Sequence, residues 1–239
     1  MPLSMLNEAV GHSRIKRDFK TRERRARCAD TVRKTIEQVN ALPQDLLTDE
    51  EGHARCGWCG TDADYIRYHD EEWGVPVRDD LRLFEKICLE GFQCGLSWIT
   101  ILKRREAFRE CFAGFDPHRL AKFTTSDVER LMIDSRIIRN RAKIEAAIQN
   151  ARTMRTMVDK DESLSKLLWQ FAPKKQRVYR RLDQVPAITD ESTRMSRRLK
   201  KAGWKFVGPT TCYALMQATG MVNDHLRGCF RHGAVKALR

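Results

Sequence analysis

The sequence predicts an all-α fold, and three observations support this prediction. Apolar residues recur at helical spacing in several segments, so that each segment would form a helix with one buried face. Glycines follow two of these segments, at Gly203 and Gly220, in the position just past the end of many helices. Alternating apolar and polar residues, which predict half-buried strands, are scarce. We therefore expect helices packed on helices, without an internal repeat.

The amino-acid composition indicates where the protein is located and which class of partner it binds. The chain has 239 residues, enough for one large domain or two, and carries a formal net charge of +13. The positive electrostatic field of such a chain attracts polyanions, among which nucleic acid is the commonest in the cytosol. The alternative is a basic protein that binds no nucleic acid. Eight cysteines without a signal-peptide pattern indicate reduced thiols or metal ligands, and hence a cytoplasmic location. No apolar run approaches the roughly 20 residues of a membrane span.

Residues 1–51 are predicted to form a basic N-terminal extension, partly disordered or helical. Eight Lys and Arg residues crowd positions 14–27 with few apolar neighbours, so this stretch cannot bury much surface. A short amphipathic stripe follows within 31–47, and Pro43 with the acidic run at 49–51 marks a boundary. Acidic residues in the extension argue against a mitochondrial targeting peptide. Residues 52–239 are expected to form the functional domain.

The first predicted helix of that domain begins behind Asp79 and Asp80, which can accept hydrogen bonds from free backbone N–H groups. Glu90 is expected at its end. Its apolar stripe consists of Leu81, Phe84, Ile87 and Cys88.

Four more helices are predicted downstream. One carries Val128, Leu131 and Met132 behind Ser126 as a candidate cap, and the next carries Ile144, Ala147, Ile148 and Ala151. Segments 192–202 and 210–219 form the last two, each closed by one of the glycines named above.

Positive charge gathers in the connection between the predicted helix that contains Val128 and the predicted helix that contains Ile144. The segment 134–141 forms a short connection, and Arg139, Arg141 and Lys143 lie at the start of the following helix. Backbone N–H groups at a helix start bind anions, and guanidinium groups add charge. This arrangement is typical of a helix-hairpin-helix, which holds the sugar-phosphate backbone without reading bases. The alternative is a solvated helical corner, because Arg136 stands where small residues are expected.

Two short segments at opposite ends of the domain carry the best metal signal. They contain Cys56 with His69, and His225 with Cys229. Two thiolates and two imidazoles suit a tetrahedral Zn²⁺ site, which is structural when four protein ligands leave no position for water. The second pair would lie on one face if that segment is helical. Ordinary buried Cys and His residues are one alternative; because Cys59 completes a C-x-x-C, it is also a possible ligand or half of a redox pair.

Six short motifs follow one another along the chain in a recognisable order. They are RCGW at 55–58, YHDEEWGVP at 68–76, LEGFQCGLSWIT at 89–100, IIRNRAKI at 137–144, KFVG at 205–208 and VNDH at 222–225. With these motifs the chain resembles the 3-methyladenine DNA glycosylase I family, the Tag-type enzymes of the helix-hairpin-helix glycosylase superfamily, over about residues 54–232. The basic extension lies outside the resemblance.

The resemblance implies a helix-hairpin-helix glycosylase fold with a zinc-stapled junction between the ends of the domain. One structural Zn²⁺ would be held by Cys56, His69, His225 and Cys229, which leaves Cys59 as a non-ligand thiol. With no open coordination position, the metal would not activate water.

The resemblance also implies a base pocket made of Tyr68, Trp73, Trp98 and Glu90. A purine methylated at N3 is cationic and leaves as a neutral base, so binding matters more than general-acid help. Cation–π contact contributes roughly 0.5–2 kcal/mol per aromatic face. Glu90, the residue to which we assign catalysis, would interact by about 4 kcal/mol at roughly 4 Å and an effective dielectric near 20. It would select the cation more than accelerate the reaction; the alternative is a surface carboxylate at a helix end.

The implied partner is double-stranded DNA containing alkylated purines, from which a monomeric enzyme would flip and excise N3-methyladenine to begin base excision repair. Gly95 and Leu96 would fill the gap in the base stack, and Arg139, Arg141 and Lys143 would contact phosphates. The hairpin offers no Lys for a Schiff base, so no AP-lyase activity is expected. Alternatives are a zinc-stapled, non-catalytic DNA-binding module and a glycosylase with a shifted lesion preference. In a bacterium the enzyme would act on the nucleoid in the cytoplasm.

Overall fold

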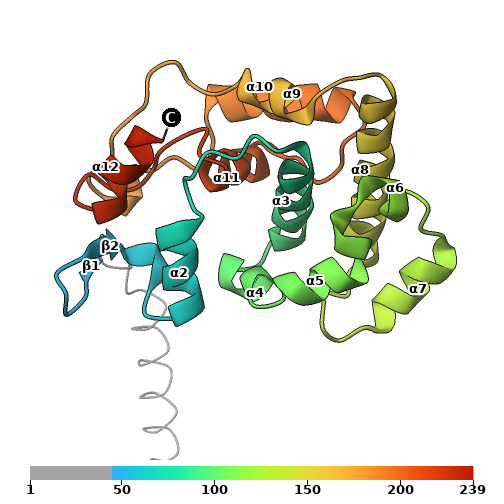
Figure 1. The fold of residues 1–239 in the computed structure, drawn as a ribbon, viewed down its shortest axis with the longest axis horizontal. Coiled ribbons are helices and arrows are strands. Elements are labelled where there is room, and N and C mark those ends of the chain that lie inside the picture. The colour runs from blue at the N-terminus through green and yellow to red at the C-terminus, as the bar shows by residue number, and fades with distance from the viewer. Residues whose placement is uncertain (1–44, 239) are drawn as a thin grey trace, which may run out of the picture. The chain divides into compact units, whose positions relative to one another are not determined.

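The computed structural model describes residues 45–238, which are mostly helical, as predicted (Figure 1). Within this range helices predominate over strands. The helices are α2 (Ala63–Glu71), α3 (Asp80–Gln93), α4 (Trp98–Leu102), α5 (Arg105–Cys111), α6 (Pro117–Leu120), α7 (Thr125–Ile133), α8 (Arg141–Asp159), α9 (Leu164–Trp169), α10 (Asp190–Lys201), α11 (Pro209–Ala218) and α12 (Phe230–Ala237). Three single 3-10 turns are η1 (Gly57–Cys59), η2 (Ala113–Phe115) and η3 (Leu182–Gln184).

A small antiparallel hairpin precedes the helices. Strands β1 (Leu46–Thr48) and β2 (Ala54–Cys56) pair with Leu46 opposite Cys56. The expected domain boundary at residue 51 falls inside this hairpin, which belongs to the same compact unit as the helices. Strands of three residues are too short for an alternating pattern to reveal them. The basic stretch at 14–27 and most of the stripe at 31–47 lie outside the described residues.

Helix α3 runs through the centre of the domain and packs against α4, α8, α9 and α11 (Figure 1). Asp79 caps it as predicted, because its carboxylate accepts a hydrogen bond of 2.8 Å from the Arg82 N–H. Asp80 has another role: it accepts hydrogen bonds from the Leu164 and Ser165 N–H groups and so joins the start of α9 to that of α3. The helix continues to Gln93, so Glu90 lies within its last turn and not at its end.

The later helices begin and end close to the predicted positions. Thr124, and not Ser126, caps α7, in a reciprocal box with Asp127. Asn140 caps α8 through a hydrogen bond of 3.1 Å from the Lys143 N–H. Gly203 and Gly220 follow α10 and α11 with φ of +96° and +71°, the left-handed conformation that glycine adopts without strain.

Gly220 also permits a close approach that builds the site. A Cβ atom there would lie 2.4 Å from the Gly74 carbonyl oxygen, so a side chain has no room. Because the backbones meet, the Gly74 N–H donates to the Gln217 carbonyl at 3.2 Å, and the Val77 N–H donates to that of Thr219 at 3.1 Å. The segment that follows α2 is thereby fixed alongside α11.

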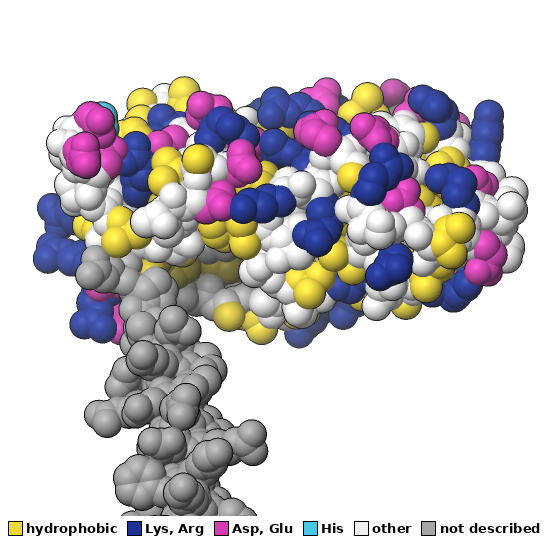
Figure 2. All heavy atoms as spheres, turned by 90° about the horizontal axis from the view of Figure 1, so that it is seen from below, with side chains coloured by type: hydrophobic (Ala, Val, Ile, Leu, Met, Phe, Trp, Pro, Cys, Tyr) yellow, Lys and Arg dark blue, Asp and Glu magenta, His cyan; other side chains and the backbone are white. Residues whose placement is uncertain are grey.

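The surface is rich in cations. Figure 2 shows a face on which Lys and Arg side chains are spread among hydrophobic ones. Within residues 45–238, no helix combines the length and the apolar character that crossing a bilayer requires.

Candidate active site and metal cluster

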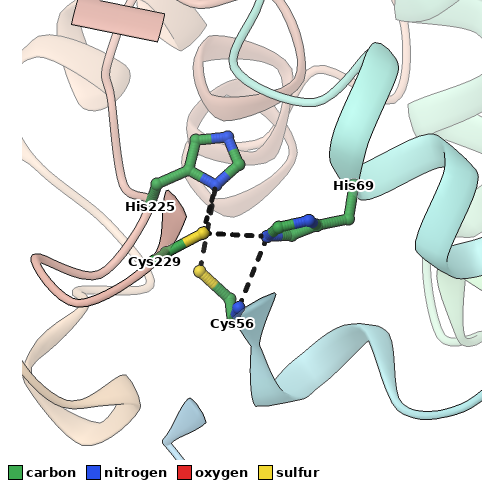
Figure 3. A group of neighbouring side chains, drawn as sticks. All are labelled: Cys56, His69, His225 and Cys229. Atoms are coloured by element: carbon green, nitrogen blue, oxygen red, sulfur yellow. Dashed lines mark hydrogen bonds between the residues drawn. The ribbon is translucent and has the colours of Figure 1, made fainter. Parts of the chain in front are cut away.

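The four predicted metal ligands converge into one buried cluster (Figure 3). The Cys229 Sγ lies 3.5 Å from the His69 Nε2 and 3.6 Å from the His225 Nδ1, and the Cys56 Sγ lies 3.9 Å from that same Nδ1. All four donor atoms fall within 4.8 Å of one another. A tetrahedral ion with bonds of about 2.3 Å to sulfur and 2.0–2.1 Å to nitrogen separates its donors by roughly 3.3–3.8 Å. The donor set and its spacing therefore fit such an ion.

Each imidazole has its outer nitrogen held, which turns the other nitrogen toward the cluster. The His69 Nδ1 is 2.7 Å from the Asp70 carboxylate, and the His225 Nε2 donates to the Trp73 carbonyl at 3.0 Å. A hydrogen bond from Cys56 lowers the pKa of the Cys229 thiol, and both histidines act in the same direction. The site thus favours a thiolate at Cys229, which is the form that binds metal, while the same hydrogen bond and burial raise the pKa of the Cys56 thiol.

One expectation about the cluster is wrong. His225 and Cys229 do not share a helical face, because the segment between them forms a turn and α12 begins only at Phe230. The Cys229 N–H donates to the Leu226 carbonyl at 2.8 Å, and this tight turn brings the two ligands together. Cys59 is buried but does not join the four-residue cluster.

The base-pocket residues predicted from the motifs also come together. They line one cavity of about 350 Å³, a volume within the range of small-molecule sites. Its predicted members are Tyr68, Trp73, Glu90 and Trp98, and the members not predicted include Trp58, Tyr65, Gln93, Gln217 and Asp224.

Aromatic contacts connect the cavity with the metal cluster. Trp58 packs against Trp73 with ring centres 4.9 Å apart at 65°, and Tyr68 lies 5.3 Å from Trp98. Trp73 in turn meets the His225 ring edge-on at 4.7 Å. Since the Trp73 carbonyl also accepts a hydrogen bond from His225, the cluster fixes one aromatic wall of the cavity.

Glu90 is buried in the cavity wall, which contradicts the alternative of a surface carboxylate. Burial raises its pKa to about 8, and the charge of Lys86 opposes the rise. Its carboxyl is therefore mostly protonated at neutral pH in the free protein, and a cationic ligand would favour its ionised form. Within residues 45–238, its Oε2 has no hydrogen-bond partner, and neither have the Trp58 and Trp98 Nε1 atoms. These three atoms belong to residues that line the cavity and can pair with a ligand or with water there.

Asp224 is a second carboxylate on the cavity wall, and no role was predicted for it. It is buried, and its Oδ2 accepts hydrogen bonds from the Tyr213 hydroxyl at 2.6 Å and the Gln217 amide at 2.9 Å. Its place in the VNDH motif, beside a metal ligand, was the available sequence signal.

The loop between α3 and α4 presents Gly95 and Leu96. Gly95 has φ of +80°, and the Leu96 N–H donates to the Gln93 carbonyl at 2.7 Å, which closes a tight turn. The Leu96 side chain is 40% exposed although it is apolar. An exposed leucine beside the cavity-lining Gln93 and Trp98 is available for contact with a partner.

The predicted phosphate contacts differ in their surroundings. Arg139 is exposed just before α8, and Arg141 shares its guanidinium with Glu129 at 2.8 Å. Lys143 is buried, and its ammonium donates to the Phe92 and Cys94 carbonyls at 2.9 and 2.5 Å. Two of the three N–H groups of the Lys143 ammonium are thus directed to carbonyls at the end of α3, and the contact of Lys143 with a phosphate stays a prediction.

Arg136, the unexpected residue of the connection between α7 and α8, is held by carboxylates. Its guanidinium lies 2.8 Å from Asp134 and 2.7 Å from Glu110. The ion pair with Arg136 lowers the pKa of Asp134 well below its usual range. Its charge is thus largely compensated within the protein.

Comparisons with known proteins agree with the motifs. A model of the methyladenine glycosylase family matches residues 58–232. DNA-3-methyladenine glycosylase 1 of Escherichia coli K12 is 51% identical over 177 residues, which cover 73% of this chain and 95% of that protein. A crystal structure of a 3-methyladenine DNA glycosylase I superposes with a TM-score of 0.72 at 50% identity, covering 74% of this chain and 98% of the other. Another, in complex with 3-methyladenine, gives 0.70 at 35% identity, with 74% and 96% covered. The chain therefore belongs to the methyladenine glycosylase family.

Proposed function

We propose that this protein is a DNA glycosylase that excises 3-methyladenine from alkylated DNA by hydrolysing the N-glycosidic bond. The observation that carries the proposal is an aromatic cavity with one buried carboxyl group, Glu90, whose Oε2 has no hydrogen-bond partner within residues 45–238, in a chain of this family. Excision of a damaged base is the first step of base excision repair.

The charge of the lesion explains how such a cavity would recognise it. Methylation at N3 makes the base cationic while it remains attached to the sugar, and the base becomes neutral when the bond breaks. Tyr68, Trp73 and Trp98 offer aromatic faces that attract a cation, by roughly 0.5–2 kcal/mol each. A cationic ring near Glu90 would lower the pKa of the carboxyl from about 8, so that lesion binding releases a proton at neutral pH.

Recognition and catalysis make different demands on Glu90. As the glycosidic bond breaks, positive charge moves from the base to the sugar, so a carboxylate facing the base stabilises the bound state more than the transition state. We therefore assign Glu90 chiefly to selection of the alkylated base over neutral adenine. Asp224 is a second acidic group in the same cavity, to which we assign no step.

We infer that Cys56, His69, His225 and Cys229 hold one Zn²⁺ ion. The support is their donor chemistry, their burial and their mutual distances. With four protein ligands the ion supplies cross-linking and leaves no coordination site for water. The residues themselves then join β2 and α2 to the segment before α12 and hold Trp73 at the cavity wall.

On the DNA side, we assign phosphate contacts to Arg139 and Arg141 and the filling of the emptied stack to Gly95 and Leu96. The short connection between α7 and α8, followed by a capped helix start, supports a helix-hairpin-helix. The partner is double-stranded DNA containing alkylated purines. We expect a monomer that acts in the cytoplasm, on the nucleoid if the source is bacterial.

Release of free base from N-methylated duplex DNA tests the function. The wild-type protein should liberate 3-methyladenine without cutting the strand, and Glu90→Gln should lose discrimination against neutral adenine. Quantifying 3-methylguanine in the same reaction measures lesion preference, and a gel of the DNA measures strand cleavage. Tight binding to methylated duplex without release of any base would instead indicate a non-catalytic DNA-binding module.

A further inference from the structure

A buried lysine lies behind the base pocket and has no part in the steps described above. Lys86 is on α3, 9% exposed, one helical turn before Glu90. Residues four apart share a helix face, with Cβ atoms about 6 Å apart. The Lys86 Nζ also lies 5.8 Å from the centre of the Tyr68 ring. The ammonium is thus next to two walls of the cavity without lining it.

The other carboxylates near Lys86 already have cationic partners. Each accepts hydrogen bonds of 2.7–2.8 Å from an arginine of α5: Glu72 from Arg105, and Glu85 from Arg109. Glu90 differs from them, because its Oε2 has no hydrogen-bond partner within residues 45–238. Arg105 and Arg109 are thus engaged by Glu72 and Glu85, which leaves the positive charge of Lys86 to compensate Glu90.

The electrostatics of the two groups agree with this arrangement. Burial raises the pKa of Glu90, and Lys86 is the cation that opposes the rise. Burial lowers the pKa of Lys86, and Glu72 and Glu90 oppose that change. The remaining titratable groups that line the cavity with Glu90 are Tyr65 and Tyr68, whose own pKa values are raised by burial, and Asp224.

We propose that Lys86 is a positioning residue of the base pocket, whose ammonium favours ionisation of Glu90 when the cationic base binds and so sets the lower pH limit of lesion recognition. This inference rests on the proposed function, because it requires Glu90 to face an alkylated base. Lys86 acts through Glu90 and not by contact with the base, since a cation beside a cationic ring would otherwise only repel it.

Direct titration of Glu90 tests the interaction without any enzyme activity. The full-length protein is labelled with ¹³C at glutamate carboxyl groups, and the Glu90 signal is assigned by its loss in Glu90→Gln. In Lys86→Met the midpoint should rise by about one pKa unit, because removal of a neighbouring cation disfavours the carboxylate. An unchanged midpoint overturns the proposal. Lys86→Gln provides the same test if the Met variant does not fold.

The pH profile of excision then tests the role in recognition. For Lys86→Met, kcat/KM for 3-methyladenine release should fall about tenfold at pH 7 and less than about twofold at pH 9.5, because a midpoint one unit higher lowers the carboxylate fraction only below it. Lys86→Arg should restore the profile. Lys103→Met, which removes an exposed cation paired with Asp62, is the matched control and should leave the pH profile of kcat/KM unchanged.

The outcomes separate the two proposals. An equal loss of kcat/KM at every pH would indicate a structural role only and overturn the assignment of Lys86. If the wild-type protein releases no methylated base, the proposed function fails, while the NMR titration still decides whether Lys86 controls Glu90.

Discussion

The Nδ1 atom of His69 lies 2.7 Å from a carboxylate oxygen of Asp70, the next residue in the chain. Asp70 is itself held by Arg55, whose Nε donates to both carboxylate oxygens at 3.0 and 2.9 Å. Arg55 also pairs with Asp49, which stands just after β1. The orientation of one imidazole of the proposed metal site therefore depends on a chain of charges that extends into the hairpin of β1 and β2.

Asp70→Asn should weaken metal binding about 10- to 100-fold, because the neutral amide holds the His69 ring less firmly and makes it a poorer donor. Competition with a chromogenic zinc chelator measures the affinity. Asp64→Asn is a suitable control: this half-exposed residue of the same helix pairs with Arg67, away from the cluster. Equal affinities for the wild type and Asp70→Asn would contradict the role given to Asp70.

Cys229→Ala should remove near-stoichiometric zinc and lower the thermal midpoint together, since binding energy at a structural site is also folding energy. Metal analysis of the purified protein and thermal unfolding provide the two measurements. Cys59→Ala should keep the metal, because Cys59 is buried outside the cluster. If Cys229→Ala retained both metal and stability, the staple would be excluded.

The pKa of Glu90 makes stability depend on pH in a defined direction. Its folded-state pKa is raised to about 8, so the native protein favours the protonated carboxyl. The protonated carboxyl therefore contributes to the free energy of unfolding below about pH 4.5. This contribution, measured relative to Glu90→Gln, is lost progressively between about pH 4.5 and pH 8, by about 1.4 kcal/mol per pKa unit. Urea unfolding of both proteins across this range measures the difference, and a difference independent of pH would refute the buried, raised pKa.

Leu96→Ala should weaken binding and excision while changing the free energy of unfolding by no more than about 1 kcal/mol, because the residue is 40% exposed in the free protein. Leu89→Ala is the contrasting control: it removes a core side chain that is 2% exposed and should cost about 2–5 kcal/mol of stability. Fluorescence of a base analogue opposite the lesion would follow flipping. Normal excision by Leu96→Ala would argue against a role as a plug.

Arg139→Ala should lower affinity for duplex DNA almost equally for all sequences and reduce the slope of log K against log salt by about one. Arg141→Ala should have a smaller effect, since Glu129 already shares its guanidinium. Lys143→Met should reduce the salt slope less than Arg139→Ala does, because two of the three N–H groups of Lys143 contact carbonyls in the turn after α3. Fluorescence anisotropy at several salt concentrations distinguishes the three variants, and equal reductions for Arg139→Ala and Lys143→Met would contradict this difference.

Most helices and the ligand set could be predicted because their signals are local or carried by motifs. Gly203 and Gly220 stop helices through their own backbone freedom, and Asp79 caps α3 from its side chain. The metal and pocket residues were found because Cys, His, Trp and acidic groups stood in motifs of a known order. Their convergence, however, is a property of the fold and had to be observed.

Sequence reasoning was less informative where contacts between distant parts of the chain determine the surroundings of a residue. Lys143 looks like a surface cation from its neighbours, but its ammonium reaches carbonyls 49 and 51 residues away. His225 and Cys229 have helical spacing but lie in a turn. Lys86 and Glu90 were detectable as opposite charges four residues apart in a predicted helix with an apolar stripe. Only the structure shows that both are buried, which distinguishes them from an ordinary surface pair.

The ligand cluster joins residues that are far apart along the polypeptide: Cys56 and His225 are 169 positions apart. During synthesis from the N-terminus, a nascent chain that has not reached His225 presents only half of the donor atoms, and Cys229 follows still later. The four side chains can therefore converge only after Cys229 has been synthesised, and the hydrogen bond by which His225 holds the Trp73 carbonyl forms equally late.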